Sequence, residues 1–402
     1  MGELSSTERE AVERAQAEPM LDQVLAWSAL NSGSRNLAGL EQVADLLADA
    51  FASLPGELKL VEPATVSEVD SAGRTAEIQH GRHLHLKVRP TAPVQLLFTG
   101  HMDTVFGPDH EFQETRWLED GVLNGPGVAD MKGGIAVMLA SLKAVEQSAA
   151  ADRLGYEVVI NSDEEVGSPA SAPLLAAAAQ GKHAALTYEP AALPDGTLAG
   201  ARPGSGNFSF VVRGRSAHAG RNPEEGRNAV VAAAELALRL SMSKTPGLTI
   251  NPARIEGGSA NNVVPDLAIL RVNLRPRTTD DQEIAARLIA KALDETAAQH
   301  DVYIEAHGGF GRPPKPLTGE AEALFQLVSK AGADLGQSIG WKASGGVCDG
   351  NNIAACGVPV VDTMGVRGGK IHSMEEYLIV DSLKERAALS ALTILRLLGE
   401  SA

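Results

Sequence analysis

Histidine and carboxylate side chains occur where several predicted strands end and where one predicted helix begins, and together they could bind divalent cations. The residues are His101, Asp103, Asp130, Glu164, Glu165, Glu189 and His372. Asp163, Glu164 and Glu165 are consecutive, and each carboxylate makes the ionisation of its neighbours less favourable. Such a run forms either a solvated turn or one side of a cation site. Two imidazoles with three carboxylates suit a pair of Zn²⁺ ions about 3.5–4 Å apart that share one bridging acid.

Spacing within two of the motifs suggests which side chains could bind a metal ion and which could position a neighbour. His101 and Asp103 point the same way on an extended chain, so Asp103 could hold the second imidazole nitrogen of His101. Glu164 and Glu165 would face opposite ways on an extended chain, so one could bind a metal ion while the other lies beside it.

Ordinary structural roles remain open for the other three residues. Asp130 could cap the helix predicted at 131–145, since Asp is a common N-cap residue. Glu189 could be a solvated acid at a strand end, and His372 an exposed loop histidine.

The elements that must position these residues alternate between apolar strands and amphipathic helices. The expected strands and β-rich segments are 58–69, 82–90, 94–100, 157–162 and 184–190, and the expected helices are 7–30, 37–54, 131–145 and 171–181. This alternation predicts an α/β fold, with a mostly parallel mixed sheet that carries helices on both faces. Because the carboxyl ends of parallel strands converge on one crevice, we expect the site residues to meet there.

A second folding unit is predicted after Gly200, where GARPGSG (200–206) suits a linker or hinge. Alternating strands and amphipathic helices follow, at 207–216, 228–241, 267–276, 281–299 and 302–308. Antiparallel strands with helices on one face form an α+β unit. We therefore expect an inserted α+β domain at 204–313 between two parts of a catalytic domain, 1–203 and 314–402.

Composition limits the classes of partner. The chain has 402 residues, 44% of them hydrophobic, and a formal net charge of −16, which argues against nucleic acid or an anionic membrane as a general partner. The N-terminal residues contain no apolar segment typical of a secretory signal, and no run approaches the roughly 18 apolar residues that span a bilayer. Cys348 and Cys356, eight residues apart, fit neither a metal knuckle nor a redox motif. We expect a cytoplasmic protein.

Five motifs together resemble the M20 family of dinuclear zinc peptidases and deacylases. They are GHMDTVFG, GPGVADMKGG, DEEVGS, YEP and GGKIHS, in this order. The resemblance spans essentially the whole chain and looks closest to the glutamate carboxypeptidase (carboxypeptidase G2-like) branch. It implies a zinc-peptidase-like catalytic domain and an inserted lid or dimerisation domain. It also implies two bound Zn²⁺ ions, with Co²⁺ or Mn²⁺ as alternatives.

The resemblance assigns a role to each site residue of the catalytic domain. Asp130 would bridge the two metal ions, and His101 and either Glu165 or Glu189 would be divided between them. His372 would complete the set, Glu164 would be the general base and Asp103 would orient His101. The family often has a cis peptide after its bridging Asp, which makes Asp130–Met131 a candidate.

The inserted domain carries further matches to the family. GRSAHAG places His218 where the family has a histidine that reaches the active site, commonly from the partner subunit of a homodimer. EGGSANNVVP places Asn262 at a position that faces the substrate, and VNLRPRT places Arg275 where an arginine binds the substrate carboxylate. Asn273 stands where relatives often have Asp. In the second part of the catalytic domain, GGVCDGNN, which includes Cys348, is expected to line the cleft.

The resemblance predicts hydrolysis of an amide or peptide bond that releases a C-terminal amino acid with a free carboxylate. The substrate would be a small peptide or an N-acyl amino acid. Alternatives are an N-acyl-amino-acid deacylase or a dipeptidase of the same family, and a non-catalytic amino-acid- or peptide-binding protein on the same fold. A cysteine hydrolase using Cys348 and His372 leaves the carboxylates unexplained. A dinucleotide enzyme fails because GARPGSG is not a G-x-G-x-x-G motif between a strand and a helix.

Overall fold

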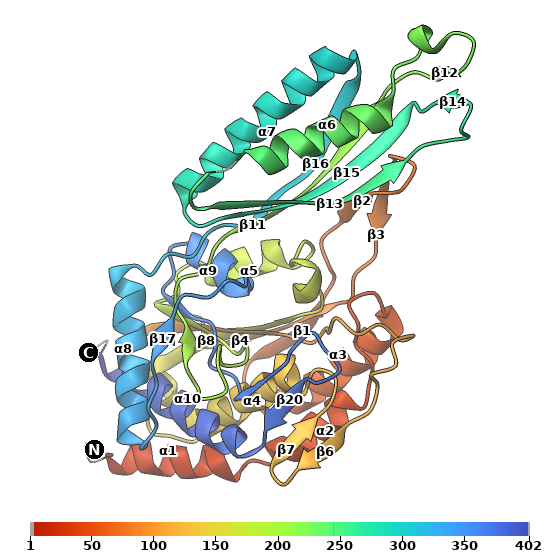
Figure 1. Cartoon of the computed structure of the whole chain (residues 1–402). Coiled ribbons are helices and arrows are strands. Elements are labelled where there is room, and N and C mark those ends of the chain that lie inside the picture. The colour runs from red at the N-terminus through yellow and green to blue at the C-terminus, as the bar shows by residue number, and fades with distance from the viewer. Residues whose placement is uncertain (1–3, 244, 401–402) are drawn as a thin grey trace. The chain divides into compact units, whose positions relative to one another are not determined.

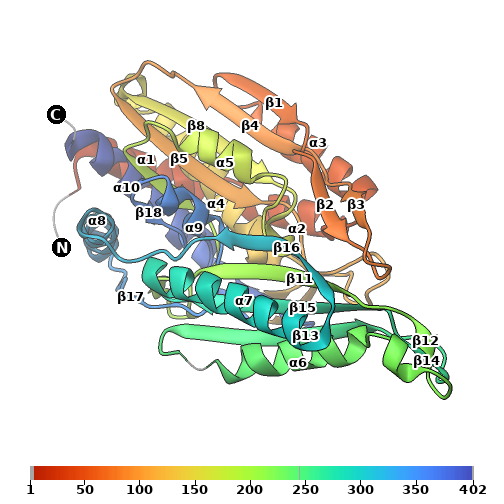
Figure 2. The same cartoon turned by 90° about the horizontal axis from the view of Figure 1, so that it is seen from above.

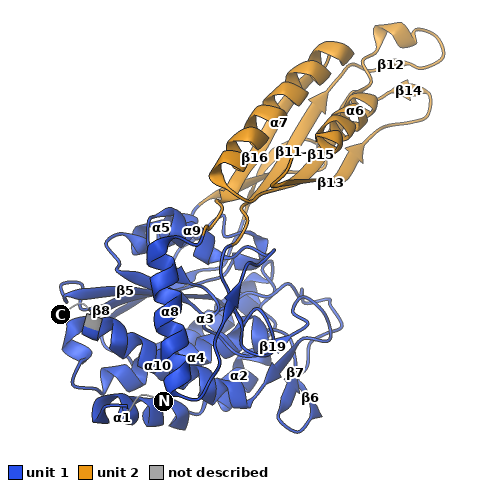
Figure 3. Ribbon diagram, turned by 60° about the vertical axis from the view of Figure 1, so that its left-hand side comes forward, with its two compact units in different colours: residues 1–64, 79–201, 317–402 blue, residues 65–78, 202–316 orange. Residues whose placement is uncertain are grey.

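A six-stranded sheet forms the centre of the larger of two units into which the chain divides. The structure is a computed structural model that describes residues 4–243 and 245–400. Unit 1 comprises residues 1–64, 79–201 and 317–402, and unit 2 comprises residues 65–78 and 202–316 (Figure 3). Unit 2 is therefore built from two insertions in the chain of unit 1.

The sheet of unit 1 is mixed. Its strands, in spatial order, are β1 (Glu57–Val61), β4 (His83–Val88), β8 (Leu154–Asn161), β5 (Val94–His101), β9 (Ala184–Thr187) and β18 (Val360–Val361) (Figure 2). β5 runs parallel to β8 and β9, and β9 runs parallel to β18, whereas β4 is antiparallel to both β1 and β8. Central parallel strands are buried on both faces, which explains the nearly continuous apolar runs of β5 and β8. The expected α/β class with a mostly parallel mixed sheet is confirmed.

Helices cover both faces of this sheet (Figure 1). They are α1 (Ser6–Ala17), α2 (Met20–Ser28), α3 (Leu37–Phe51), α4 (Gly133–Glu146), α5 (Ala172–Ala179), α8 (Gly319–Asp334), α9 (Asp349–Ala355) and α10 (Asp381–Glu400). Successive strand residues point to opposite faces. Phe98 and Val158 accordingly pack in the core cluster that includes α1, α4 and α10, whereas Leu97 and Val159 pack with α5 and α9. Among the described helices, none has the length and apolar character that crossing a membrane requires.

The strands of a second, smaller sheet in unit 1 precede Asp130 and flank His372 in the sequence. Its strands pair in the order β19 (Gly368–Gly369), β20 (Tyr377–Ile379), β7 (Val122–Asn124) and β6 (Arg116–Glu119). Because β20 pairs with β7, the segment that follows His372 lies beside the segment that precedes Asp130. A third, two-stranded sheet joins β10 (Leu198–Ala199) to β17 (Trp341–Lys342).

Unit 2 is an α+β unit. Its antiparallel strands pair in the order β13 (Leu248–Gly257), β15 (Leu267–Pro276), β11 (Ser205–Arg213) and β16 (Tyr303–Arg312). The helices α6 (Ala229–Met242) and α7 (Thr279–His300) pack on one face, where Phe210 and Leu270 meet Leu236 and Ile289. Two short hairpins complete the unit, β2 (Val66–Val69) with β3 (Thr75–Ile78), and β12 (Ala217–His218) with β14 (Val263–Val264).

Residues 65–78 differ from the expected domain division, which assigned them to the first catalytic segment. Val69 packs against Val211 and Ile269 on the face of the unit 2 sheet opposite the helices. Arg271 Nη2 also donates a hydrogen bond to the carbonyl oxygen of Val69, 2.9 Å away. These contacts link segments about 140 to 200 residues apart, so local sequence patterns do not reveal them.

Two element boundaries also differ from the expectation. The helix predicted at 7–30 is divided at Pro19 into α1 and α2, because proline cannot donate within a helix and restricts the residue before it. The edge strand β13 was not predicted, since Pro252 interrupts its pattern and a register shift follows between Pro252 and Arg254.

Candidate active site

His101, the last residue of β5, presents one imidazole nitrogen to two carboxylates. Its Nε2 lies 3.2 Å from Oδ1 of Asp130 and 3.7 Å from Oε2 of Glu189. Its Nδ1 lies 3.0 Å from the backbone carbonyl oxygen of Asp103. A carbonyl oxygen only accepts, so Nδ1 carries a hydrogen. Without a cation, Nε2 also carries a hydrogen and donates it to Asp130, and a bound metal ion would take the place of that proton.

Asp130 lies between two histidines. While Oδ1 faces His101, Oδ2 lies 3.3 Å from Nε2 of His372, and this same nitrogen lies 3.1 Å from Oε2 of Glu165. Asp130 does not cap α4, which begins at Gly133 after the irregular turn Val128–Lys132. The Asp130–Met131 peptide bond is cis, as the resemblance implied.

Glu164 and Glu165 belong to a short 3₁₀ turn, Glu164–Val166, so the alternation that an extended chain would impose does not apply to them. The carboxylate of Asp103 holds this turn: Oδ1 accepts the backbone N–H of Glu164 and Oδ2 accepts that of Glu165, both at 3.1 Å. Ser34 Oγ donates to Oδ2 of Asp103 at 2.7 Å. The turn geometry lets both glutamates contribute to one cluster, because side chains in a turn need not alternate as they do on a strand.

The ligand atoms form two overlapping groups around His101. Those of His101, Asp130 and Glu165 lie within 4.8 Å of one another, and so do those of His101, Glu164 and Glu189. The structure thus brings together six of the predicted residues: His101, Asp130, Glu164, Glu165, Glu189 and His372. Asp103 holds the backbone of Glu164 and Glu165.

The first acid of the DEE run is buried and supports the turn. Asp163 Oδ2 accepts the backbone N–H groups of Ala170 and Ser171, at 2.6 and 3.2 Å. Cys348 and its neighbours Asp349 and Asn351, which were expected to line the cleft, are buried as well. Its neighbour Asp349 accepts hydrogen bonds from Asn161 Nδ2 at 2.6 Å and from Ser168 Oγ. Both aspartates therefore fix the loop that carries Glu164 and Glu165.

Electrostatics in the cluster favour a bound cation. Burial and the carboxylate of Asp130 raise the pKa of Glu165 to about 8, against the contact with His372, which lowers it. Contacts with Asp130 and Glu165 raise the pKa of His372 to about 11. Burial alone would raise the pKa of Asp130, but hydrogen bonds from His101 and His372 hold it well below its usual value. These carboxylates need positive charge beside them, and oxygen and imidazole donors suit Zn²⁺.

The three site residues predicted in the inserted domain, His218, Asn262 and Arg275, all lie in unit 2. His218 lies in β12, and the N–H of the following Ala219 donates to the carbonyl oxygen of Asn262 at 2.9 Å, so His218 and Asn262 are neighbours. The Nδ1 of His218 accepts the N–H of Gly220 at 3.1 Å, which leaves Nε2–H of the neutral ring as a donor. Arg275 lies in β15, where its Nε donates to Oδ1 of Asn273 at 3.1 Å.

Sequence reasoning missed two residues that hold the site. Ser34, in the turn after α2, bonds to Asp103, and Glu376, four residues after His372, accepts backbone N–H groups of the turn that carries Asp130. Ser34 had no signal, because a serine in a turn is common. The acidic pair in HSMEEY was a signal for Glu376, although its partners could not be read from it.

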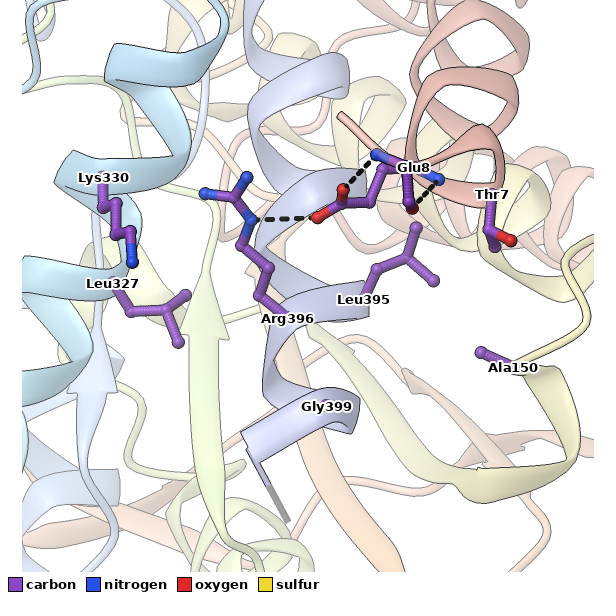
Figure 4. Close-up of a pocket in the computed structure, with 9 residues that line it drawn as sticks. Thr7, Glu8, Ala150, Leu327, Lys330, Leu395, Arg396 and Gly399 are labelled. Atoms are coloured by element: carbon purple, nitrogen blue, oxygen red, sulfur yellow. Dashed lines mark hydrogen bonds and ion pairs between the residues drawn. The ribbon is translucent and has the colours of Figure 1, made fainter. Parts of the chain in front are cut away.

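A separate hollow in unit 1 has no part in this cluster. It measures about 500 Å³ and is lined by residues of α1, α8 and α10 (Figure 4). Arg396 there pairs with Glu8, Nε to Oε1, at 3.1 Å, and its Nη1 lies 2.8 Å from Oδ2 of Asp334. None of the cation-binding candidates lines this hollow, and its half-buried Arg396 already faces two carboxylates.

The fold and the cluster are those of a metal-dependent hydrolase class, and comparison with known proteins identifies the family. The model of peptidase family M20/M25/M40 matches residues 97–396, and the chain belongs to this family. It is therefore a peptidase or amidohydrolase of the M20 type, as the five motifs predicted.

Two curated relatives cover most of the chain. Carboxypeptidase G2 of Pseudomonas sp. (strain RS-16) is 30% identical over 83% of this chain and 80% of its own length. Succinyl-diaminopimelate desuccinylase of Pseudomonas syringae pv. tomato is 27% identical over 84% of this chain and 88% of its own length.

Solved structures share the fold. A tripeptidase from Staphylococcus aureus has a TM-score of 0.74 with 23% identity, over 96% of this chain and 99% of that one. The YXEP protein of Bacillus subtilis, described as a dinuclear metal-binding peptidase of the M20 family, has a TM-score of 0.64 with 15% identity, over 96% and 99%.

Proposed function

We propose that this chain uses two divalent cations to hydrolyse an amide or peptide bond and releases a C-terminal amino acid with a free carboxylate. The observation that carries the proposal is the position of Asp130, whose two oxygens face His101 and His372 separately. A bridging carboxylate needs this arrangement. The 30% identity to carboxypeptidase G2 supports the carboxypeptidase type of reaction.

The five donors divide into two sets that share Asp130. His101 and Glu189 would hold one cation with Asp130, and Glu165 and His372 would hold the other. Zn²⁺ suits these donors, with Co²⁺ or Mn²⁺ as alternatives. When bound, the cations lower the pKa of a water molecule and polarise the carbonyl group of the substrate. The description of the related YXEP protein as a dinuclear metal-binding peptidase supports two ions.

Glu164 would act as the general base. Its carboxylate takes the proton of the attacking water and later gives it to the leaving amine, so one residue serves as base and then as acid. The position supports this role, since Glu164 is buried beside His101 and Glu189 and its backbone is held by Asp103. Asp103 would act by positioning both the general base and His101.

Unit 2 would recognise the substrate. Arg275 would pair with the α-carboxylate of the leaving amino acid, because a guanidinium can donate two parallel hydrogen bonds to a carboxylate. The free Nε2–H of His218 would stabilise the negatively charged oxygen that forms in the transition state. Asn262, next to His218, would bind a polar group of the substrate.

A homodimer through unit 2 is the proposed assembly. The outer face of α6 exposes an apolar stripe of Val231, Leu238 and Met242, which are 51%, 57% and 75% exposed. The neighbouring β13 is an edge strand of its sheet. An apolar stripe beside a strand edge that can still pair suits a second copy of the same surface. Leu238→Glu should then shift the molar mass from dimer to monomer in light scattering, and a monomeric wild-type chain would contradict the proposal.

An N-acyl-amino-acid deacylase is the second candidate, favoured by the similarity to the desuccinylase. A dipeptidase would use the same residues. A cysteine hydrolase is disfavoured because Cys348 is buried at the start of α9. A non-catalytic binding protein is disfavoured because such a protein would not need Glu164, the proposed general base, next to the cation donors. The two free cysteines fit the proposed cytoplasmic location.

Release of free amine from pooled substrates tests the proposal. The pools are N-acyl amino acids, folyl-glutamate-type substrates and dipeptides, each assayed with added Zn²⁺ and after chelation. Release that chelation abolishes supports the two-cation hydrolase and identifies the leaving amino acid. Release that persists in a fully chelated protein contradicts it, and no release from any pool by protein with two bound ions favours the binding role.

A further inference from the structure

The turn that carries Asp130 is wrapped around the side chain of one buried acid, Glu376. Oε1 of Glu376 accepts the backbone N–H groups of Ala129 and Asp130, both at 3.0 Å, and Oε2 accepts that of Gly127 at 3.2 Å. The residue is 1% exposed, so these bonds form away from water. Glu376 therefore fixes the backbone from which the Asp130 side chain projects.

The backbone of Glu376 binds the start of the same turn. Its carbonyl oxygen accepts Nδ2 of Asn124 at 2.6 Å and the N–H of Gly125 at 3.4 Å. The amide of Asn124 is oriented from its other end, because Arg116 Nε donates to Oδ1 at 2.8 Å. Five hydrogen bonds thus join residues 124–130 to one residue that is nearly 250 positions later in the chain.

The turn can close around the carboxylate because Gly127 adopts a left-handed conformation, with φ of +73°. A Cβ at this position would also lie 2.9 Å from Cγ2 of Thr104. Glycine alone meets both conditions without strain.

Glu376 also determines where the loop of His372 is attached. His372 lies four residues earlier, and the N–H of Glu376 donates to the carbonyl oxygen of Ser373 at 3.1 Å. The side chain of His372 is 53% exposed, so the surrounding protein packs against only part of it. Its distance to Asp130 consequently depends on how the loop 372–376 is anchored, and the bonds of Glu376 form that anchor together with the bond from Nδ2 of Asn124 to the carbonyl oxygen of Met374, at 3.0 Å.

We propose that Glu376 is a positioning residue that sets the distance between Asp130 and His372 and thereby the affinity for the second of the two cations. The proposal rests on the two-cation function proposed above. Glu376 does not touch the cations in this scheme. It acts through the backbone of Asp130 on one side and through the loop of His372 on the other.

Cation titration of Glu376→Gln tests this role. The substitution keeps the size of the side chain but turns one accepting oxygen into a donor that faces a backbone N–H. It therefore removes hydrogen bonds between the Glu376 side chain and the turn that carries Asp130. Metal-free protein is titrated with Co²⁺, and the visible absorption and the heat of binding report the two ions separately. We expect the ion bound by Glu165 and His372 to be weakened about 10- to 100-fold, a range typical of residues that orient ligands. The ion bound by His101 and Glu189 should be affected less.

Glu375→Gln is the matched control. It makes the same chemical change one residue away, at an exposed acid whose Oε2 pairs with Lys370 at 2.9 Å. This control should bind both ions as the wild type does. Glu376→Asp keeps the charge with a shorter side chain and should recover part of the lost affinity.

Three outcomes would overturn the inference. One is a Glu376→Gln protein that binds both ions with wild-type affinity. Another is equal weakening of both ions together with a lowered melting temperature, since that indicates general structural damage. If Glu376→Gln does not fold, Glu376→Asp decides, and wild-type affinity in that variant would overturn the proposal. The wild-type arm tests the proposed function separately, because a wild-type chain that binds only one ion contradicts the two-cation site itself.

Discussion

Asp103 Oδ1 accepts the backbone N–H of Glu164 at 3.1 Å, and this bond joins the end of β5 to the turn after β8. The two strands are parallel neighbours, with His101 in register with Asn161. Asp103 therefore connects the histidine motif to the acidic motif through the backbone of the proposed general base. The role implied by the family, orientation of His101, accounts for only part of what this carboxylate does.

Replacing Asp103 with Ala should lower kcat more than it changes KM. The variant loses the acceptor for the N–H groups of Glu164 and Glu165, so the general base is held less firmly. We expect kcat to fall about 10- to 100-fold, the range seen when residues that orient active-site groups are removed. Steady-state kinetics measure the effect, and Ser34→Ala, which removes one donor to Asp103, should give a smaller loss. Equal losses in the two variants would argue against the backbone role of Asp103.

Glu164→Ala should bind both cations and lose turnover. General acid–base catalysis contributes about 10²- to 10⁴-fold, so kcat should fall by that factor. Metal content measured by mass spectrometry on the same sample shows whether the site is intact. A variant with two ions and normal kcat would remove Glu164 from the mechanism.

Stabilisation of the protein by Zn²⁺ should increase as the pH rises from about 6 to about 8. Without cations, the pKa of Glu165 is raised to about 8, above its ordinary value of 4.5, so this proton stabilises the fold at low pH and its contribution is lost as the pH passes about 8. A cation must displace that proton and the proton of His372, whose pKa is raised to about 11. Melting temperatures with and without Zn²⁺ across this range measure the trend. A difference that does not change with pH would contradict it.

Arg275→Ala should raise KM for substrates that have a free α-carboxylate. Loss of a hydrogen bond to a charged group costs about 1.5–3 kcal/mol, which corresponds to about 10- to 150-fold in kcat/KM. The control is a substrate whose terminal carboxylate is amidated, since the wild type and the variant should then react with similar kcat/KM. If the variant loses equally with both substrates, Arg275 does not bind this carboxylate.

His218→Ala should lower kcat and leave KM nearly unchanged. The oxyanion exists only in the transition state, so removal of a donor to it costs about 10²- to 10³-fold in kcat. A variant with a raised KM and a normal kcat would show instead that His218 binds the substrate in its ground state.

The elements that carry the site were predictable because their signals are local. β5 and β8 are apolar runs bounded by turn residues, and His101 and Glu164 follow them directly. The positions of Asp130, Glu189 and His372 followed from family motifs and from the convergence of strand ends. The hydrogen bonds that hold these residues could not be predicted in this way. Ser34 contacts Asp103 across 69 residues and Glu376 contacts Asp130 across 246, and such pairings depend on the complete fold.

The conformation of the acidic run could not be predicted from its sequence. An extended chain would have placed the two glutamates on opposite sides, whereas their N–H groups turn inwards to the carboxylate of Asp103. One side chain 61 residues earlier than Glu164 therefore fixes the backbone direction of both glutamates.

Unit 1 is assembled from both ends of the described chain, and this topology sets the order in which a nascent protein can become active. Helix α10 packs against α1 and α4 in the main core, and His372 belongs to the same late segment. During synthesis, the strands β5, β8 and β9 and four of the five cation donors leave the ribosome long before their last partners. Residues 202–316 of unit 2, in contrast, contain a complete sheet with both of its helices, so this part can fold first. His372 follows residues 202–316 in the chain, so the proposed second cation set can be completed only after this part of unit 2 has been synthesised.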